Sequence, residues 1–93
     1  MTMADTIRDK LTASFAPEAL DVADESARHA GHAGAQPGGE THFNVRIVSN
    51  AFEGLSRVER QRRVYAVLAD ELKARVHALS LTTLTPAEVW NEH

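Results

Sequence analysis

Residues 42–81 read HFNVRIVSNAFEGLSRVERQRRVYAVLADELKARVHALSL, and they contain the pattern of a strand, a turn and a long helix. Polar and apolar residues alternate over residues 42–49, which predicts a strand with one buried face. Ser56 followed by Glu59 is a capping box, because each side chain can satisfy a free backbone N–H at the start of a helix. The apolar spacing that follows predicts a helix to about Ala74.

A second strand is predicted directly after this helix, over residues 76–81. Two strands joined by a helix of this length run parallel and are connected by a right-handed crossover. We therefore expect the two strands to be neighbours in one sheet and to begin at the same end of it.

The remaining segments add two helices and one strand to this unit. Apolar residues four apart predict a first helix over residues 4–15, which a proline then ends. Alternation over about residues 20–25 predicts a short strand. Near the end of the sequence, residues 85–88 form a second capping box, and we expect Val89 and Trp90 to anchor the short helix that it starts.

The predicted order is α-β-β-α-β-α in a single domain over residues 1–93. This is an α+β fold with a three-stranded mixed sheet, covered by helices on one face and open to water on the other. The residues expected in the core are Ile7, Leu11, Phe15, Phe43, Val45, Ile47, Val58, Tyr65, Leu68, Leu72, Leu79 and Leu81. Residues 28–41 hold four of the five glycines, and we expect them to form a mobile loop.

Composition limits the functions to consider. The formal net charge of −3 argues against a dedicated nucleic-acid binder, although a local basic patch can outweigh the total. There is no cysteine, so the chain has no thiolate metal ligand of its own. No run of apolar residues is long enough to cross a bilayer, and we expect a soluble, cytoplasmic protein without a membrane contact. No catalytic motif is present, which predicts a non-enzyme.

Three histidines are candidate metal ligands. His77 lies at the start of the predicted second parallel strand, and His29 and His32 lie in the glycine-rich loop that leads into the same end of the sheet. The two readings of His77 are a half-buried strand residue bonded to backbone and an imidazole ligand for zinc, copper or iron. His42 reads as an exposed strand residue, and His93 is terminal.

A basic cluster is predicted at the start of the long helix, formed by Arg57, Arg60, Arg62 and Arg63. Helical geometry places Arg57 and Arg60 on the side away from Val58 and Tyr65. The cluster is either a solvated charged face or a docking surface for a protein or for DNA phosphates.

The ordered segments HFNVRIVS from His42, FEG from Phe52, RQRRVY from Arg60 and VHAL from Val76 resemble the BolA family, and the similarity extends over nearly the whole chain. The resemblance implies a type II KH-like fold. It also implies a monothiol glutaredoxin as partner and a [2Fe–2S] cluster shared with that glutaredoxin and glutathione. By position, His77 and His29 would be the iron ligands, with His32 as an alternative to His29; two imidazoles on one iron and thiolates on the other is a known arrangement. The isolated chain is expected to bind no cofactor, and whether it forms a homodimer when free stays open.

The family also includes transcriptional regulators, so DNA binding through the arginines stays open. The KH signature itself is misplaced: Gly31 and Gly34 are spaced as GxxG, but they lie between two predicted strands rather than two helices. KH-type RNA binding is therefore disfavoured.

Overall fold

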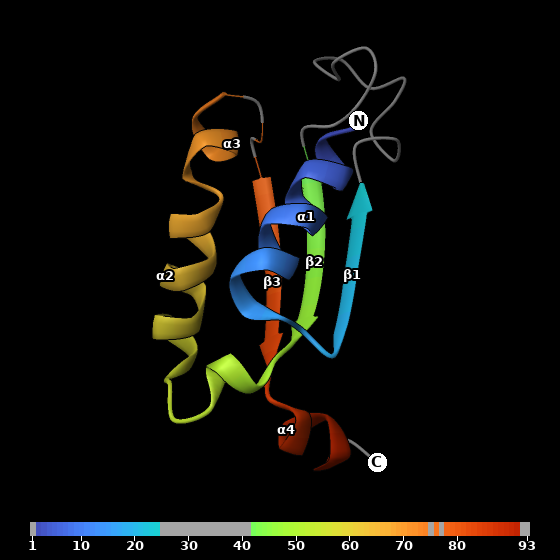
Figure 1. Cartoon of the computed structure of the whole chain (residues 1–93). Helices are drawn as coiled ribbons and strands as arrows, with labels where there is room; N and C mark the ends of the chain where they lie inside the picture. The colour runs from blue at the N-terminus through green and yellow to red at the C-terminus, as the bar shows by residue number, and fades with distance from the viewer. Residues whose placement is uncertain (1, 25–41, 75, 77, 92–93) are drawn as a thin grey trace.

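The computed structural model describes residues 2–24, 42–74, 76 and 78–91. Its elements, in chain order, are α1 Met3–Phe15, β1 Ala19–Asp24, β2 His42–Val48, the 3-10 helix η2 Asn50–Phe52, α2 Arg57–Val67, α3 Ala69–Ala74, β3 Ala78–Leu84 and α4 Pro86–Asn91 (Figure 1). The expected α+β class and the order of helices and strands are confirmed, with a short 3-10 helix added and the long helix divided in two.

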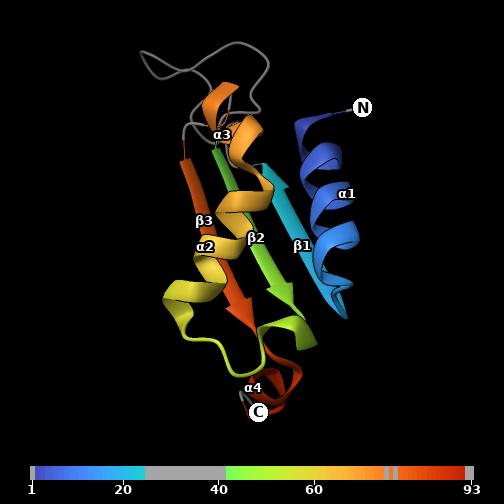
Figure 2. The same ribbon diagram turned by 60° about the vertical axis from the view of Figure 1, so that its left-hand side comes forward.

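The three strands form one mixed sheet in the order β1-β2-β3. β1 and β2 are antiparallel, whereas β2 and β3 are parallel, as the crossover rule predicts. α1 and the α2–α3 pair lie on the same face of this sheet, while α4 lies beyond the far end of β3 (Figures 1 and 2). The last strand begins two residues later than predicted and runs on to Leu84.

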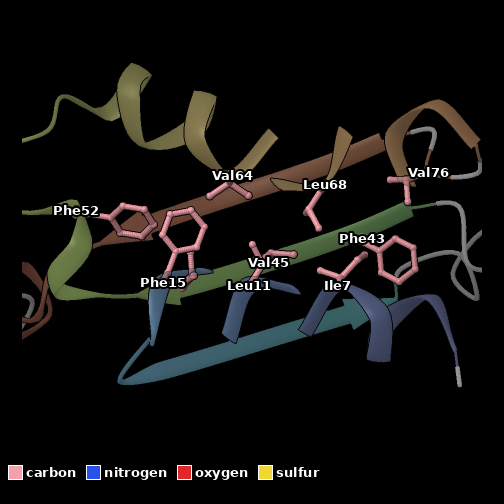
Figure 3. Packing of buried hydrophobic residues seen from close by; sticks show 10 residues of the cluster. Ile7, Leu11, Phe15, Phe43, Val45, Phe52, Val64, Leu68 and Val76 are labelled. Carbon is pink, nitrogen blue, oxygen red and sulfur yellow. The ribbon is translucent and has the colours of Figure 1, made fainter. Parts of the chain in front are cut away.

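The alternation in β2 gives the sheet its two faces. Phe43, Val45 and Ile47 are buried under the helices, and Asn44 is exposed on the opposite side. Figure 3 shows the resulting core as a row of side chains between sheet and helices, from Phe52 and Phe15 at one end to Phe43 and Val76 at the other. The ring centroids of the first two lie 5.2 Å apart, in a tilted contact.

The face that α2 buries differs from the prediction. Val58 is 58% exposed and Tyr65 39% exposed, so neither belongs to the core. Val64, which was not predicted, is buried instead, and the predicted burial of Leu68 is confirmed; the two are four residues apart and therefore on one helix face (Figure 3). Leu72, Leu79 and Leu81 are partly buried and pack against the core as expected.

The helical segment after Ser56 is broken at Leu68, where the backbone turns to φ −100° and ψ 17°. A separate helix, α3, then runs to Ala74, the predicted end point. The ammonium group of Lys10 lies 2.9 Å from the carboxylate of the buried Glu71, so an ion pair ties α3 to α1.

The turn after β2 is organised by Ser49, which is fully buried. Its hydroxyl donates to the carbonyl oxygen of Phe15 at 2.7 Å and accepts from the N–H of Ala51 at 3.0 Å. Its own N–H donates to the carbonyl oxygen of Leu84. One residue therefore joins the end of α1, the start of η2 and the end of β3.

Helix α4 begins with the predicted capping box: the N–H of Thr85 donates to the Glu88 carboxylate, and the N–H of Glu88 donates to the Thr85 hydroxyl. The expectation that Trp90 anchors this helix is wrong, because Trp90 is 78% exposed. Val89 is partly buried.

Candidate functional site

The first candidate site is the end of the sheet at which β2 and β3 both begin. The register pairs His42 with Ala78, so the two parallel strands start level with each other. β1 ends at the same end, because Asp24 is paired with Phe43 (Figure 1). The prediction that these segments meet at one end of the sheet is confirmed.

The three histidines singled out from the sequence lie outside the described residues. His77 is the residue before Ala78 in the chain, and His29 and His32 belong to the segment between β1 and β2. The loop predicted over residues 28–41 also lies outside the described residues. Within the described residues, no group of three or more histidine, cysteine, aspartate or glutamate side chains is placed to hold a metal ion.

The second candidate site is the basic start of α2, and here the structure separates the four arginines. Arg57, Arg62 and Arg63 are exposed. Arg62 donates to the carboxylate of Glu59 at 3.0 Å, in a surface pair one helical turn long. The guanidinium groups of Arg57 and Arg63 form no hydrogen bond or ion pair with another described residue. Two guanidinium groups are therefore available to a ligand.

Arg60 does not belong to this exposed face, and the prediction that places it there is wrong. It is only 8% exposed. Its Nε donates to the carbonyl oxygen of Leu55 at 3.0 Å, and its Nη1 donates to that of Thr83 at 3.1 Å. A long charged side chain can be buried when its donors are satisfied in this way.

The charge of Arg60 is balanced by Glu88 of α4. Both guanidinium terminal nitrogens donate to the carboxylate, at 2.6 and 3.2 Å, in the two-pronged geometry that makes arginine–carboxylate pairs strong. The hydrogen bonds from Arg60, followed by the N–H of Thr85, lower the pKa of Glu88 from 4.5 to about 2. This pair fastens α4 and the end of β3 to the start of α2.

The sequence indicated one partner of this ion pair but not the other. The capping box at residues 85–88 identified Glu88 as a helix-start carboxylate, but nothing in the linear pattern connected it with an arginine 28 positions earlier. Only the parallel crossover brings the start of α2 beside the end of β3.

No helix among the described residues is both long and apolar enough to cross a membrane.

Comparison with known proteins gives consistent matches. The family model described as BolA-like protein matches residues 11–88. The chain is 54% identical over 87 residues to the Arabidopsis thaliana SufE-like protein 1, chloroplastic/mitochondrial, covering 89% of this chain and 24% of that protein. It is 48% identical to human BolA-like protein 1, covering 94% of this chain and 60% of that protein. This chain thus spans between about a quarter and somewhat over half of the length of these two relatives.

Two further matches extend the comparison. The Escherichia coli DNA-binding transcriptional regulator BolA is 44% identical over 88 residues, covering 95% of this chain and 80% of that protein. Among solved structures, the BolA domain of SufE1 from Arabidopsis thaliana superposes with a TM-score of 0.83 at 50% identity, covering 95% of this chain and 96% of that one.

Proposed function

This chain belongs to the family of BolA-like proteins, and from that premise we propose that it is a non-enzymatic adaptor that binds a monothiol glutaredoxin and shares a [2Fe–2S] cluster with it. Its role would be in the assembly or trafficking of iron–sulfur clusters, or in iron regulation. The resemblance drawn from the sequence motifs supplies the glutaredoxin and the cluster.

One observation carries the proposal: β2 and β3 begin in register, at His42 and Ala78, at the end of the sheet where β1 stops. His77 and the segment containing His29 and His32 flank these three strand ends in the sequence. A chain with histidines in those places and no cysteine suits a shared site, in which imidazoles come from one protein and thiolates from the other.

In this scheme His77, with His29 or with His32 in its place, would hold one iron. A glutaredoxin cysteine and the thiolate of glutathione would hold the other iron. When bound, the cluster supplies a transferable iron–sulfur unit with a characteristic visible absorption. The contribution of this chain would be two neutral imidazoles, one from the residue before β3 and one from the segment between β1 and β2, so cluster binding should weaken below a pH of about 6.5, where imidazoles become protonated.

We expect His77→Ala to alter the visible absorption and circular dichroism of the cluster formed with a monothiol glutaredoxin, glutathione, iron and sulfide. Water or a partner thiolate would replace the imidazole, and the cluster should be lost faster on dilution. His29→Ala alone should be partly compensated by His32, and the double variant should match His77→Ala. The terminal His93→Ala is the matched control. A wild-type spectrum and wild-type stability for His77→Ala would reduce this residue to a structural role.

The second candidate function is DNA binding, and one described feature favours it: Arg57, Arg62 and Arg63 are exposed on one short helix start. The E. coli relative carries the name of a DNA-binding regulator. Because Arg60 is buried and paired with Glu88, the exposed basic surface contains three arginines rather than four. Because Arg62 is also paired with Glu59, only a few phosphate contacts are possible, and these give a modest, salt-sensitive affinity.

Reversing Arg57 and Arg63 to glutamate should abolish duplex binding and remove its salt dependence, measured by fluorescence anisotropy at several salt concentrations. The control is Glu53→Gln, which changes the charge of an exposed residue outside α2. Unchanged affinity in the double reversal would rule out this face as the DNA surface.

A further inference from the structure

A groove lies between the start of α2 and the last half of β3, and it shares only Arg57 with the basic surface of the second candidate function. Its volume is about 230 Å³, and it is lined by Arg57, Gln61, Leu81, Thr82, Thr83 and Leu84. Leu81 to Leu84 are three to six residues beyond Ala78, where β3 begins, so the groove is roughly 10–20 Å along the strand from the proposed metal end. The two surfaces are separate.

β3 is an edge strand, and its backbone orientation can be determined from two hydrogen bonds. The carbonyl oxygen of Leu84 accepts from the N–H of Ser49, so the backbone groups of Leu84 face β2. Successive residues of a strand direct their N–H and C=O groups to opposite sides. Thr83 therefore faces the open edge, which agrees with the bond from Arg60 to its carbonyl oxygen.

The same alternation turns the backbone groups of Leu79 and Leu81 outward. No hydrogen bond joins these outward groups to another described residue. A row of open donors and acceptors at this spacing is what a further strand requires. Arg60 covers the edge at Thr83, so an added strand would reach only as far as that residue.

The side chains of the groove indicate what the added strand should carry. Leu81 and Leu84 provide apolar contact. Arg57 lines the groove, is exposed and pairs with no described residue, and no acidic side chain is among the lining residues. An acidic side chain on the ligand would complement that charge.

We propose that this groove binds an extended, acidic segment of a partner protein as a fourth strand beside β3, with its backbone paired to Leu79 and Leu81 and a carboxylate on Arg57. Strand addition to a sheet edge is an established mode of peptide recognition, in which main-chain bonds give affinity and side-chain contacts give selectivity. A peptide fits better than a nucleic acid because the edge offers alternating backbone donors and acceptors and the groove contains one cation. An adaptor with this groove could hold a second protein while its metal end is engaged.

The test uses the full, ¹⁵N-labelled chain without iron or glutaredoxin and the acetylated peptide (Thr-Val-Asp-Val)₂ as probe. We expect the amides of Leu79 and Leu81 to shift and to gain hydrogen-exchange protection, whereas those of Ser80 and Thr82, already paired with β2, change little. Arg57→Glu should weaken binding about tenfold, since one attractive contact becomes repulsive. Arg63→Glu, on the same helix but away from the groove, should bind as the wild type does.

Two matched probes separate strand addition from simple charge attraction. A peptide N-methylated at alternate residues keeps its carboxylates but loses the donors for the edge, and it should not bind. An eight-nucleotide oligothymidylate tests a nucleic acid in the same place. Binding of the methylated peptide, shifts outside β3 and α2, or displacement of the peptide by the oligonucleotide at lower concentration would overturn the proposal. His77→Ala should bind the peptide normally, so this result is independent of the cluster hypothesis.

Discussion

Replacing Leu68 by alanine should lower the free energy of unfolding by about 2–5 kcal/mol, the range measured for large-to-small changes in tightly packed cores. Leu68 is 1% exposed and packs in the row of side chains between α2 and the sheet (Figure 3). The change removes buried methyl groups at the break between α2 and α3, where two helices must stay docked on the sheet. Urea unfolding followed by far-ultraviolet circular dichroism measures the difference, with the m-value showing whether the transition stays two-state.

Tyr65→Ala is the matched comparison, because Tyr65 lies on the same helix but outside the core. Removing the Tyr65 side chain should lower the free energy of unfolding by less than about 1 kcal/mol. A cost for Tyr65→Ala equal to that for Leu68→Ala would contradict the orientation of α2. It would favour the orientation that the sequence pattern suggested.

Replacing Arg60 by alanine should destabilise the fold by about 2–4 kcal/mol. The change leaves the carbonyl oxygens of Leu55 and Thr83 without their donors and removes the partner of the Glu88 carboxylate. Breaking a fully buried ion pair costs about 3–5 kcal/mol, and the lower range here reflects that the Glu88 side chain is 43% exposed. Arg62→Ala, which removes an exposed pair with Glu59, should cost less than about 0.5 kcal/mol.

The pH dependence gives this prediction a second measurement. The pKa of Glu88 is lowered in the folded chain from 4.5 to about 2, so the folded state is more stable when Glu88 is ionised than when it is protonated. The stabilisation is therefore complete above about pH 4.5 and is lost as the pH falls toward 2. The stability gap between wild type and Arg60→Ala should narrow over that interval. A gap that is constant with pH would mean that packing, not the ion pair, carries the cost.

Local pattern determined much of the architecture. Alternation in residues 42–48 fixed which side chains of β2 face the helices, because successive side chains of a strand point to opposite faces. The capping boxes at Ser56 and Thr85 placed the starts of α2 and α4, since free N–H groups at a helix start need an acceptor. The crossover rule then made β2 and β3 parallel and brought their starts to one end of the sheet.

The orientation of α2 could not be read from the same pattern. Apolar residues occupy two sides of this helix, Val58 and Tyr65 on one and Val64 on the other, with Leu68 between them, so periodicity alone does not choose which side is buried. The structure buries the side that contains Arg60. A charged residue on the buried side is affordable only because distant segments supply its acceptors, namely Leu55, Thr83 and Glu88.

For the candidate sites too, some features could be predicted from the sequence and others were set only by tertiary packing. The sequence by itself indicated the family, which the comparisons confirm, and nominated histidines and arginines as candidate site residues, since residue types and their order are local information. Tertiary structure decided which arginines are exposed, at which end of the sheet the segments that contain the histidines connect to the strands, and that β3 is an edge strand among the described residues, with Arg57 beside it. These properties depend on which surfaces are covered by residues far away in the chain, and burial and hydrogen-bond partners at such distances are set only when the elements pack together.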